Sequence, residues 1–95
     1  MPKGYIIARV TVTDPERYAE YAEMATAAIR KHGGTPLVRG GRHEALEGEA
    51  RPRNVVIEFP SYEQARAYFY SPEYQEALRH RQPAGTAELV LVEGV

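Results

Sequence analysis

The order of elements depends most on residues 32–41, which read His32-Gly33-Gly34-Thr35-Pro36-Leu37-Val38-Arg39-Gly40-Gly41. A glycine pair after an amphipathic helix is typical of a helix end, because glycine enters the left-handed conformation without steric cost. The residues from Thr35 to Gly40 then predict a strand, and the second glycine pair predicts a bend or bulge in it. Arg39 is a permanent cation among apolar and small residues, so it requires an anion or a carboxylate as partner.

The chain before this stretch predicts a strand and then the amphipathic helix. Apolar side chains occupy every even position from Ile6 to Val12, which indicates a strand with one buried face. Asp14-Pro15-Glu16 supplies a capping residue, a proline for the first helical position and an acid for the first turn. We therefore expect a helix from there to about His32.

The chain after this stretch predicts two further strands and a divided helix. Ser61 and Ser71 each have the sequence setting of a helix cap. The third strand is rich in β-branched residues, so we expect it to be central and buried on both faces. The expected elements are an optional extension of the second strand through residues 43–46, a polar loop over 47–52, the third strand over 54–59, helices ending near Tyr70 and Arg81, and a last strand over 87–93.

This βαββαβ order predicts an α+β, ferredoxin-like fold in a single domain over residues 1–95. Four antiparallel strands would form one sheet with the helices on one face. The other face keeps too much apolar surface for solvent, and exposed apolar patches of that size mark interaction sites. We therefore expect a homodimer formed through this sheet face.

Composition narrows the classes of partner and chemistry. The 95 residues carry a formal net charge of -1, which argues against nucleic-acid and anionic-membrane binding. Cysteine is absent, and the three histidines do not have the spacing of a metal motif, so we expect no metal site and no cofactor. Residues 1–4 lead directly into a strand pattern, and we expect a cytoplasmic protein without a membrane segment.

Three charged residues are candidates for a ligand site. Arg39 would bind a substrate carboxylate or enolate, or would pair with Glu47, Glu58 or an acid of a partner chain. Arg81 would hold the same anion, or would serve only the dipole at its helix end. Glu58 is a carboxylate in a central strand, so it needs a cation or hydrogen-bond donors, with Arg39 and Arg53 as the expected choices.

Aromatic residues and a histidine complete the candidate site. Four tyrosines would border a cleft and donate hydrogen bonds to an oxygenated ligand, or would only fill the core and a dimer rim: Tyr21, Tyr68, Tyr70 and Tyr74. His32 lies on the inward stripe of the first helix and is the candidate general base or acid. Its alternative role is to cap the helix carbonyls.

Several short motifs occur in order along the chain: Gly4-Tyr5, Asp14-Pro15, Gly33-Gly34, Leu37-Val38-Arg39-Gly40-Gly41, Leu46-Glu47-Gly48, Arg53, Glu58-Phe59-Pro60-Ser61, Ser71-Pro72-Glu73-Tyr74, Arg81 and Val92-Glu93-Gly94. Their ordered combination resembles the family described as domain of unknown function 1330. The resemblance covers nearly the whole chain, and it implies a ferredoxin-like fold of the dimeric α+β barrel type. Where the family often has Trp-Tyr-Asn before Ser-Pro, this chain has Tyr68-Phe69-Tyr70.

The resemblance implies no activity, because related barrels include cofactor-independent monooxygenases, lactone isomerases and haem-dependent enzymes. Two hypotheses therefore stand side by side. In the first, the protein binds or converts a small oxygenated or aromatic acid without a cofactor, with Arg39 and Arg81 orienting the anion and His32 moving a proton. In the second, it is a non-catalytic dimeric interaction module.

Overall fold

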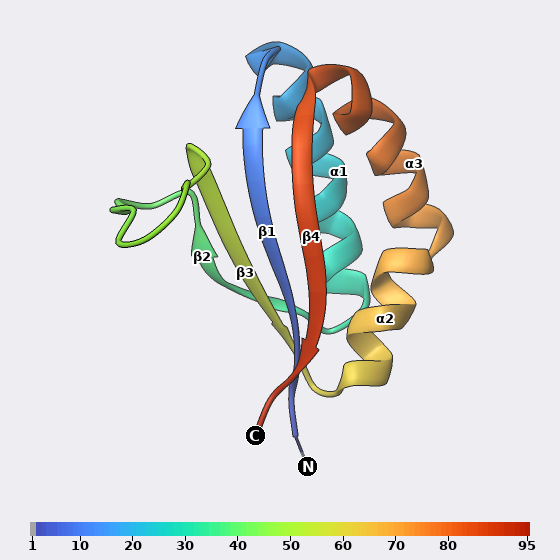
Figure 1. Ribbon diagram of the computed structural model, residues 1–95. Coiled ribbons are helices and arrows are strands. Elements are labelled where there is room, and N and C mark those ends of the chain that lie inside the picture. The colour runs from blue at the N-terminus through green and yellow to red at the C-terminus, as the bar shows by residue number, and fades with distance from the viewer. Residues whose placement is uncertain (1) are drawn as a thin grey trace.

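The computed structural model describes residues 2–95 as four strands, three helices and one 3-10 turn (Figure 1). Their order is βαββαβ with the second helix divided, as the sequence predicts. The elements are β1 (Gly4–Val12), α1 (Pro15–Lys31), β2 (Thr35–Arg39), β3 (Arg53–Phe59), α2 (Tyr62–Tyr70), α3 (Pro72–Arg81), the 3-10 turn Gln82–Ala84 and β4 (Gly85–Glu93).

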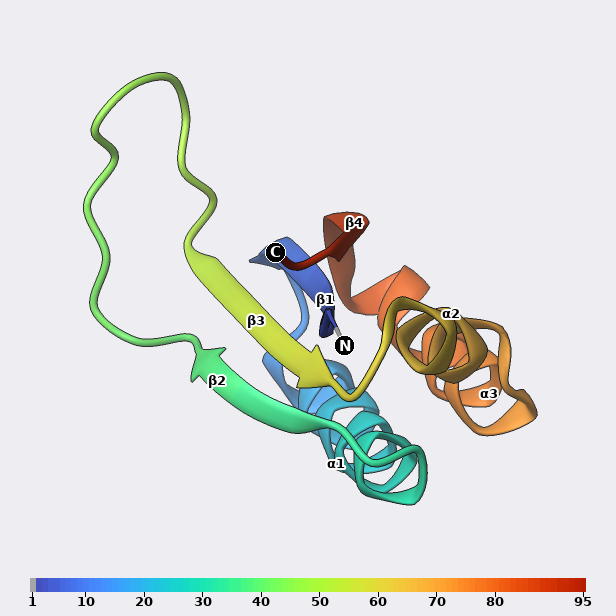
Figure 2. The same cartoon turned by 90° about the horizontal axis from the view of Figure 1, so that it is seen from below.

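The strands form one antiparallel sheet in the order β2-β3-β1-β4. All three helices lie on one face of this sheet, and the other face is uncovered in the single chain (Figures 1 and 2). The expected α+β, ferredoxin-like architecture is therefore confirmed. β3 is central, as predicted, but only its helix side is covered by helices, and among residues 2–95 no helix packs on its other side. Within residues 2–95 no helix combines the length and apolar character needed to cross a membrane.

Each helix begins at the residue that the sequence indicates. Asp14 accepts a hydrogen bond from the backbone N–H of Arg17, and Ser61 accepts one from that of Gln64. Ser71 is buried, and its hydroxyl accepts from the N–H of Tyr74 at 3.1 Å while donating to the carbonyl of Tyr68 at 2.7 Å. These caps satisfy backbone donors that the first turn of a helix leaves free.

Gly33 and Gly34 form the turn between α1 and β2, and each is required there for a different reason. Gly33 has a φ of +78°, in the left-handed region that ends a helix readily with glycine. At Gly34 a Cβ would lie 2.6 Å from Cε1 of Phe59 and 2.9 Å from Cγ2 of Ile29, so the chain can pass this close to the core only without a side chain.

The second strand is shorter than its longest expected extent. β2 ends at Arg39, and the backbone then enters the left-handed region at Gly40, with a φ of +71°. The optional extension through residues 43–46 is wrong, because this segment belongs to a loop that leaves the sheet on the side away from the helices (Figure 2). The predicted irregularity exists, but it lies between Pro36 and Val38, ahead of the second glycine pair.

Candidate functional site

A cavity lies between the sheet and helices α1 and α3. It contains about 50 Å³ of space open to a water-sized sphere, which is room for several ordered waters or a small polar group. Its walls are mostly apolar, with Ile6, Val10 and Leu89 on the sheet side. The polar side chains that line it are Tyr18, Tyr21, Thr26, Arg39, Arg53, Tyr68, Tyr74 and Arg81.

Strand alternation and one bulge bring two of the arginines to this cavity. Val55 and Ile57 face the helices, so Arg53, two residues before Val55, faces them as well. The bulge between Pro36 and Val38 shifts the pairing of β2, so that Arg39 lies opposite Val55 and lines the cavity from the same side.

The three arginines keep most of their hydrogen-bonding capacity. A guanidinium has five N–H donors. Each of the three arginines uses one of them in a hydrogen bond to a protein acceptor among residues 2–95. Arg39 donates to Oγ1 of Thr26 at 3.4 Å, Arg53 to the Tyr18 hydroxyl at 3.1 Å, and Arg81 to the carbonyl of Gly85 at 3.4 Å.

No carboxylate among residues 2–95 forms an ion pair with Arg39, Arg53 or Arg81. Arg53 and Arg81 are half-buried, and the Nε of Arg81 is fully buried without a hydrogen-bond partner. Buried polar groups and charges are normally paired, because an unpaired one loses its hydration without compensation. This cavity therefore concentrates positive charge and free donors, and residues 2–95 supply no carboxylate to balance that charge.

Buried tyrosines form the other polar part of the cavity wall. The hydroxyls of Tyr21 and Tyr74 lie 3.0 Å apart and share a hydrogen bond. Burial raises the pKa of Tyr21 and that of Tyr68 far above the ordinary value, so both hydroxyls stay protonated at neutral pH. They can donate hydrogen bonds to an oxygen of a ligand, and they cannot serve as bases.

Of the residues singled out in the sequence, Tyr21, Arg39, Tyr74 and Arg81 line this one cavity. Glu58 lies on the uncovered sheet face, where its carboxylate accepts a hydrogen bond of 3.0 Å from the hydroxyl of Tyr5, its direct partner across the strands. The expected Arg39–Glu58 pair does not form, because neighbouring positions on β3 point to opposite faces of the sheet.

His32 and Tyr70 do not line the cavity either. His32 follows the last turn of α1, where its Nε2 lies 3.3 Å from a carboxylate oxygen of Glu73. Lys31 binds the other oxygen at 2.9 Å, and these two hydrogen bonds lower the pKa of Glu73 to about 2. Tyr70 is 63% exposed and lies under the guanidinium of Arg66.

Sequence reasoning missed Tyr18, Thr26 and Arg53 as members of the site. Tyr18 shares the inward stripe of the first helix with Tyr21, so its spacing carried that signal. Arg53 was considered only as a partner for Glu58, although its parity with Val55 places it on the helix side. Thr26 could not be found from the sequence, because its contact depends on where the β2 bulge directs Arg39.

Solved structures with this fold come from several bacteria. A protein of unknown function from Rhodopseudomonas palustris has a TM-score of 0.79 at 21% identity, covering 99% of this chain and 83% of that one. SnoaB, a cofactor-independent oxygenase from Streptomyces nogalater, has a TM-score of 0.64 at 16% identity, covering 97% and 92%. A dimeric ferredoxin-like protein of unknown function from Thermobifida fusca has a TM-score of 0.55 at 19% identity, covering 99% and 92%.

At these identities the likeness shows the fold alone. A comparison with curated proteins finds no match. The model of one family, described as domain of unknown function (DUF1330), matches residues 3–95, and the chain therefore belongs to the DUF1330 family.

Proposed function

We propose that this protein binds a small organic acid in the cavity between its sheet and its helices, with the carboxylate of the acid held by arginines. The observation that carries this proposal is the group formed by Arg39, Arg53 and Arg81, which have free N–H donors and no carboxylate partner among residues 2–95. Guanidinium groups bind carboxylates through paired, charge-assisted hydrogen bonds.

The rest of the wall suits an oxygenated or aromatic body on that acid. Tyr21, Tyr68 and Tyr74 contribute ring faces and hydroxyl groups, and Ile6 and Leu89 contribute apolar surface. Small-molecule sites commonly combine apolar walls with a few polar groups that fix orientation. The cavity fits only a compact ligand in its present size, so a larger acid requires movement of the wall.

We further propose that the protein works as a homodimer. The uncovered sheet face carries Val38, Val90 and Val92, which are 42%, 51% and 39% exposed in the single chain. Burying such a patch against a second copy removes apolar surface from water. The dimeric ferredoxin-like protein from Thermobifida fusca supports the proposal by analogy of fold.

Conversion of the bound acid without a cofactor is proposed as the reaction class, supported by the fold shared with the cofactor-independent oxygenase SnoaB. In this chain the hydrogen-bonded hydroxyls of Tyr21 and Tyr74 are the groups that would hold an oxygen of the substrate. His32 remains only a sequence-based candidate for proton transfer, because its ring lies beside Glu73 and outside the cavity.

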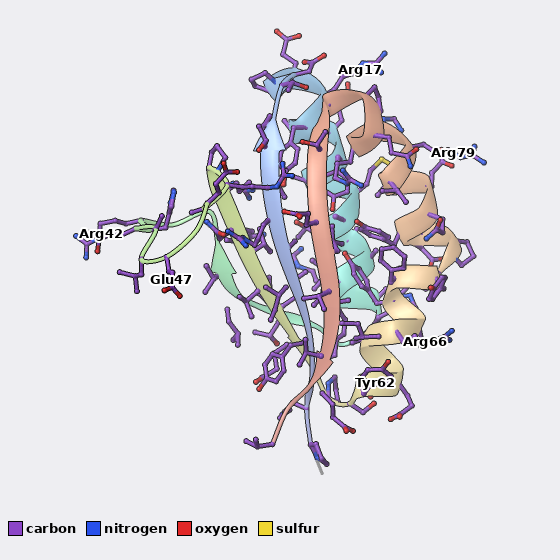
Figure 3. The ribbon with its side chains drawn as sticks, in the orientation of Figure 1. Arg17, Arg42, Glu47, Tyr62, Arg66 and Arg79 are labelled. Carbon is purple, nitrogen blue, oxygen red and sulfur yellow. The ribbon has the colours of Figure 1, made fainter. Side chains whose placement is uncertain are left out.

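The binding proposal is tested by thermal-shift measurements with a panel of small carboxylic acids and phenols, since a ligand of the native state raises its melting temperature by mass action. Arg39→Ala should remove the shift. Arg42→Ala is the matched control, because Arg42 is exposed on the loop far from the helices (Figure 3). If Arg39→Ala responds to every acid as the parent protein does, Arg39 does not bind the ligand.

The competing function is that of a non-catalytic interaction module, which the exposed apolar sheet face favours. In that case no acid in the panel shifts the melting temperature at millimolar concentration. The dimer would persist, and Arg39, Arg53 and Arg81 would be without a ligand.

A further inference from the structure

We infer that the ligand of this cavity is a compact dianion with two separated anionic groups, such as a short dicarboxylate. The inference rests on the proposed function, because it specifies the acid that the cavity binds. It follows from the positions of the three arginines, from their unused donors and from the size of the space between them.

The arginines approach the cavity from opposite edges of the sheet. Arg39 belongs to the edge strand β2, and Arg53 lies diagonally across from it on β3. Arg81 ends α3 and donates to Gly85, the first residue of the other edge strand, β4. Three strand spacings of about 4.8 Å each separate these edges.

All three arginines lie near the same end of the sheet. Arg53 pairs with Val10 on β1, and Val10 pairs in turn with Ala87 on β4, two residues beyond Gly85. Positive charge therefore lies on both sides of Val10, with Arg39 and Arg53 of the sheet on one side and Arg81, at the end of α3, on the other. Apolar groups, among them Val10 itself and Ala22 of α1, line the space between.

One carboxylate cannot satisfy this arrangement. Its roughly four lone-pair sites can accept from two neighbouring guanidinium groups, but one carboxylate does not span the strands that separate Arg39 and Arg53 from Arg81. A monocarboxylate bound at Arg39 and Arg53 would leave the buried Nε of Arg81 unpartnered, and one bound at Arg81 would leave two cations without an anion. Because no acidic side chain lines the cavity, the second negative charge has to come from the ligand.

The volume limits the skeleton that joins the two anionic groups. The open space of about 50 Å³ limits this skeleton to a short chain of carbons. A ring needs a cavity of roughly 150 Å³, so a ring-bearing dianion enters only if the wall moves. Two groups held apart by such a skeleton can each meet one of the two arginine positions. A compact dianion such as inorganic phosphate carries its charge at one point and meets only one of them.

The inference is tested by isothermal titration calorimetry with matched acids. Succinate is compared with butyrate, isophthalate with 3-methylbenzoate, and inorganic phosphate serves as the point-like dianion. We expect one dicarboxylate to bind at least about tenfold more tightly than its monocarboxylate partner and than phosphate, which is the effect of one further charge-assisted hydrogen bond.

Two variants locate the anionic groups. Arg39→Gln and Arg81→Gln should each reduce the preference for the dicarboxylate to about twofold or less, while Arg79→Gln should keep it, because Arg79 points outward from α3 (Figure 3). Arg39 is exposed, so its variant tests the inference even if Arg81→Gln fails to fold. Circular dichroism establishes that each variant is folded before titration.

The outcomes separate the inference from the proposed function. Equal affinity for dicarboxylate and monocarboxylate, or phosphate binding as tight as succinate, overturns the two-ended ligand and leaves the acid site standing. If none of the five compounds binds, both the two-ended ligand and the proposed acid site are overturned. A preference that survives in Arg39→Gln and in Arg81→Gln also overturns the inference, because the second group would then lie elsewhere.

Discussion

Replacement of Arg81 by methionine should stabilise the protein in the absence of a ligand. The Nε–H of Arg81 is buried without a partner, and leaving such a donor unsatisfied costs about 1–3 kcal/mol. Methionine keeps a long flexible side chain of similar reach and removes both the donor and the charge. If Arg81 were a structural residue, its loss would instead weaken the fold.

Two favourable contacts are lost with the guanidinium, and they set the net magnitude. Its hydrogen bond to the carbonyl of Gly85 is long, at 3.4 Å, and is therefore weak. Its charge near the C-terminus of α3 contributes about 0.3–1 kcal/mol. The difference leaves a net stabilisation of about 1 kcal/mol, which raises the melting temperature of a domain of this size by about 4–8 °C.

Urea denaturation followed by circular dichroism at pH 7 measures this difference directly. Arg79→Met is the control on the same helix, because Arg79 is exposed and its pair with Glu76 spans 3.6 Å at the surface. We expect it to change the free energy of unfolding by less than about 0.5 kcal/mol. If Arg81→Met lowers the free energy of unfolding by 1 kcal/mol or more, the reasoning is refuted, since Arg81 would then stabilise the fold without a bound anion.

Three further predictions concern the core, the pH dependence and the assembly. Gly34→Ala should destabilise the protein by about 1–3 kcal/mol in urea denaturation, because the new Cβ would lie 2.6 Å from the ring of Phe59. The Glu73 carboxyl should titrate near 2 in an NMR pH titration, and since this pKa is below its ordinary 4.5, its stabilising effect should be complete above pH 4.5 and lost as the pH falls towards 2. Light scattering at micromolar concentration should give about twice the 10.7 kDa chain mass, and Val90→Lys should give the single chain mass.

Each of these predictions has a matched control. Gly41→Ala should have little effect on stability, since a Cβ there meets no atom within 4 Å. Lys31→Ala should move the Glu73 pKa back towards its ordinary value, and an unchanged pKa would show that Lys31 is not the cause. Glu76→Lys also introduces a lysine, on an exposed position of α3, and changes the net charge by +2 against +1 for Val90→Lys, so a monomer in both variants would argue against the sheet face as the interface.

The local signals of the sequence predicted the fold well. Helix starts at Asp14, Ser61 and Ser71 depend on contacts within three residues of the cap, so the chain itself contains the information. The apolar alternation of β1 and the β-branched run of β3 likewise mark strands without reference to neighbours. These features are short-range, and the structure confirms them.

The candidate site was predicted in part, because its geometry depends on long-range register. The side of the sheet that Arg39 faces is decided by one bulge in β2, and such a shift reverses the face of every residue that follows. The partner of Glu58 is Tyr5, and this pair is visible only once the register of β1 on β3 is known. His32 follows the end of α1, close to where the sequence predicts that the helix ends, yet its neighbour Glu73 is set by where α3 begins.

The account depends most on the claim that Arg39, Arg53 and Arg81 together hold an anion in this cavity. Its most direct test is an NMR titration that follows the Nε–H signals of the arginines while succinate or isophthalate is added. We predict that the signals of Arg53 and Arg81 shift with saturation, together with that of Arg39, while those of Arg42 and Arg79 stay in place. Shifts confined to Arg42 and Arg79, or equal shifts at all arginines without saturation, would contradict the claim.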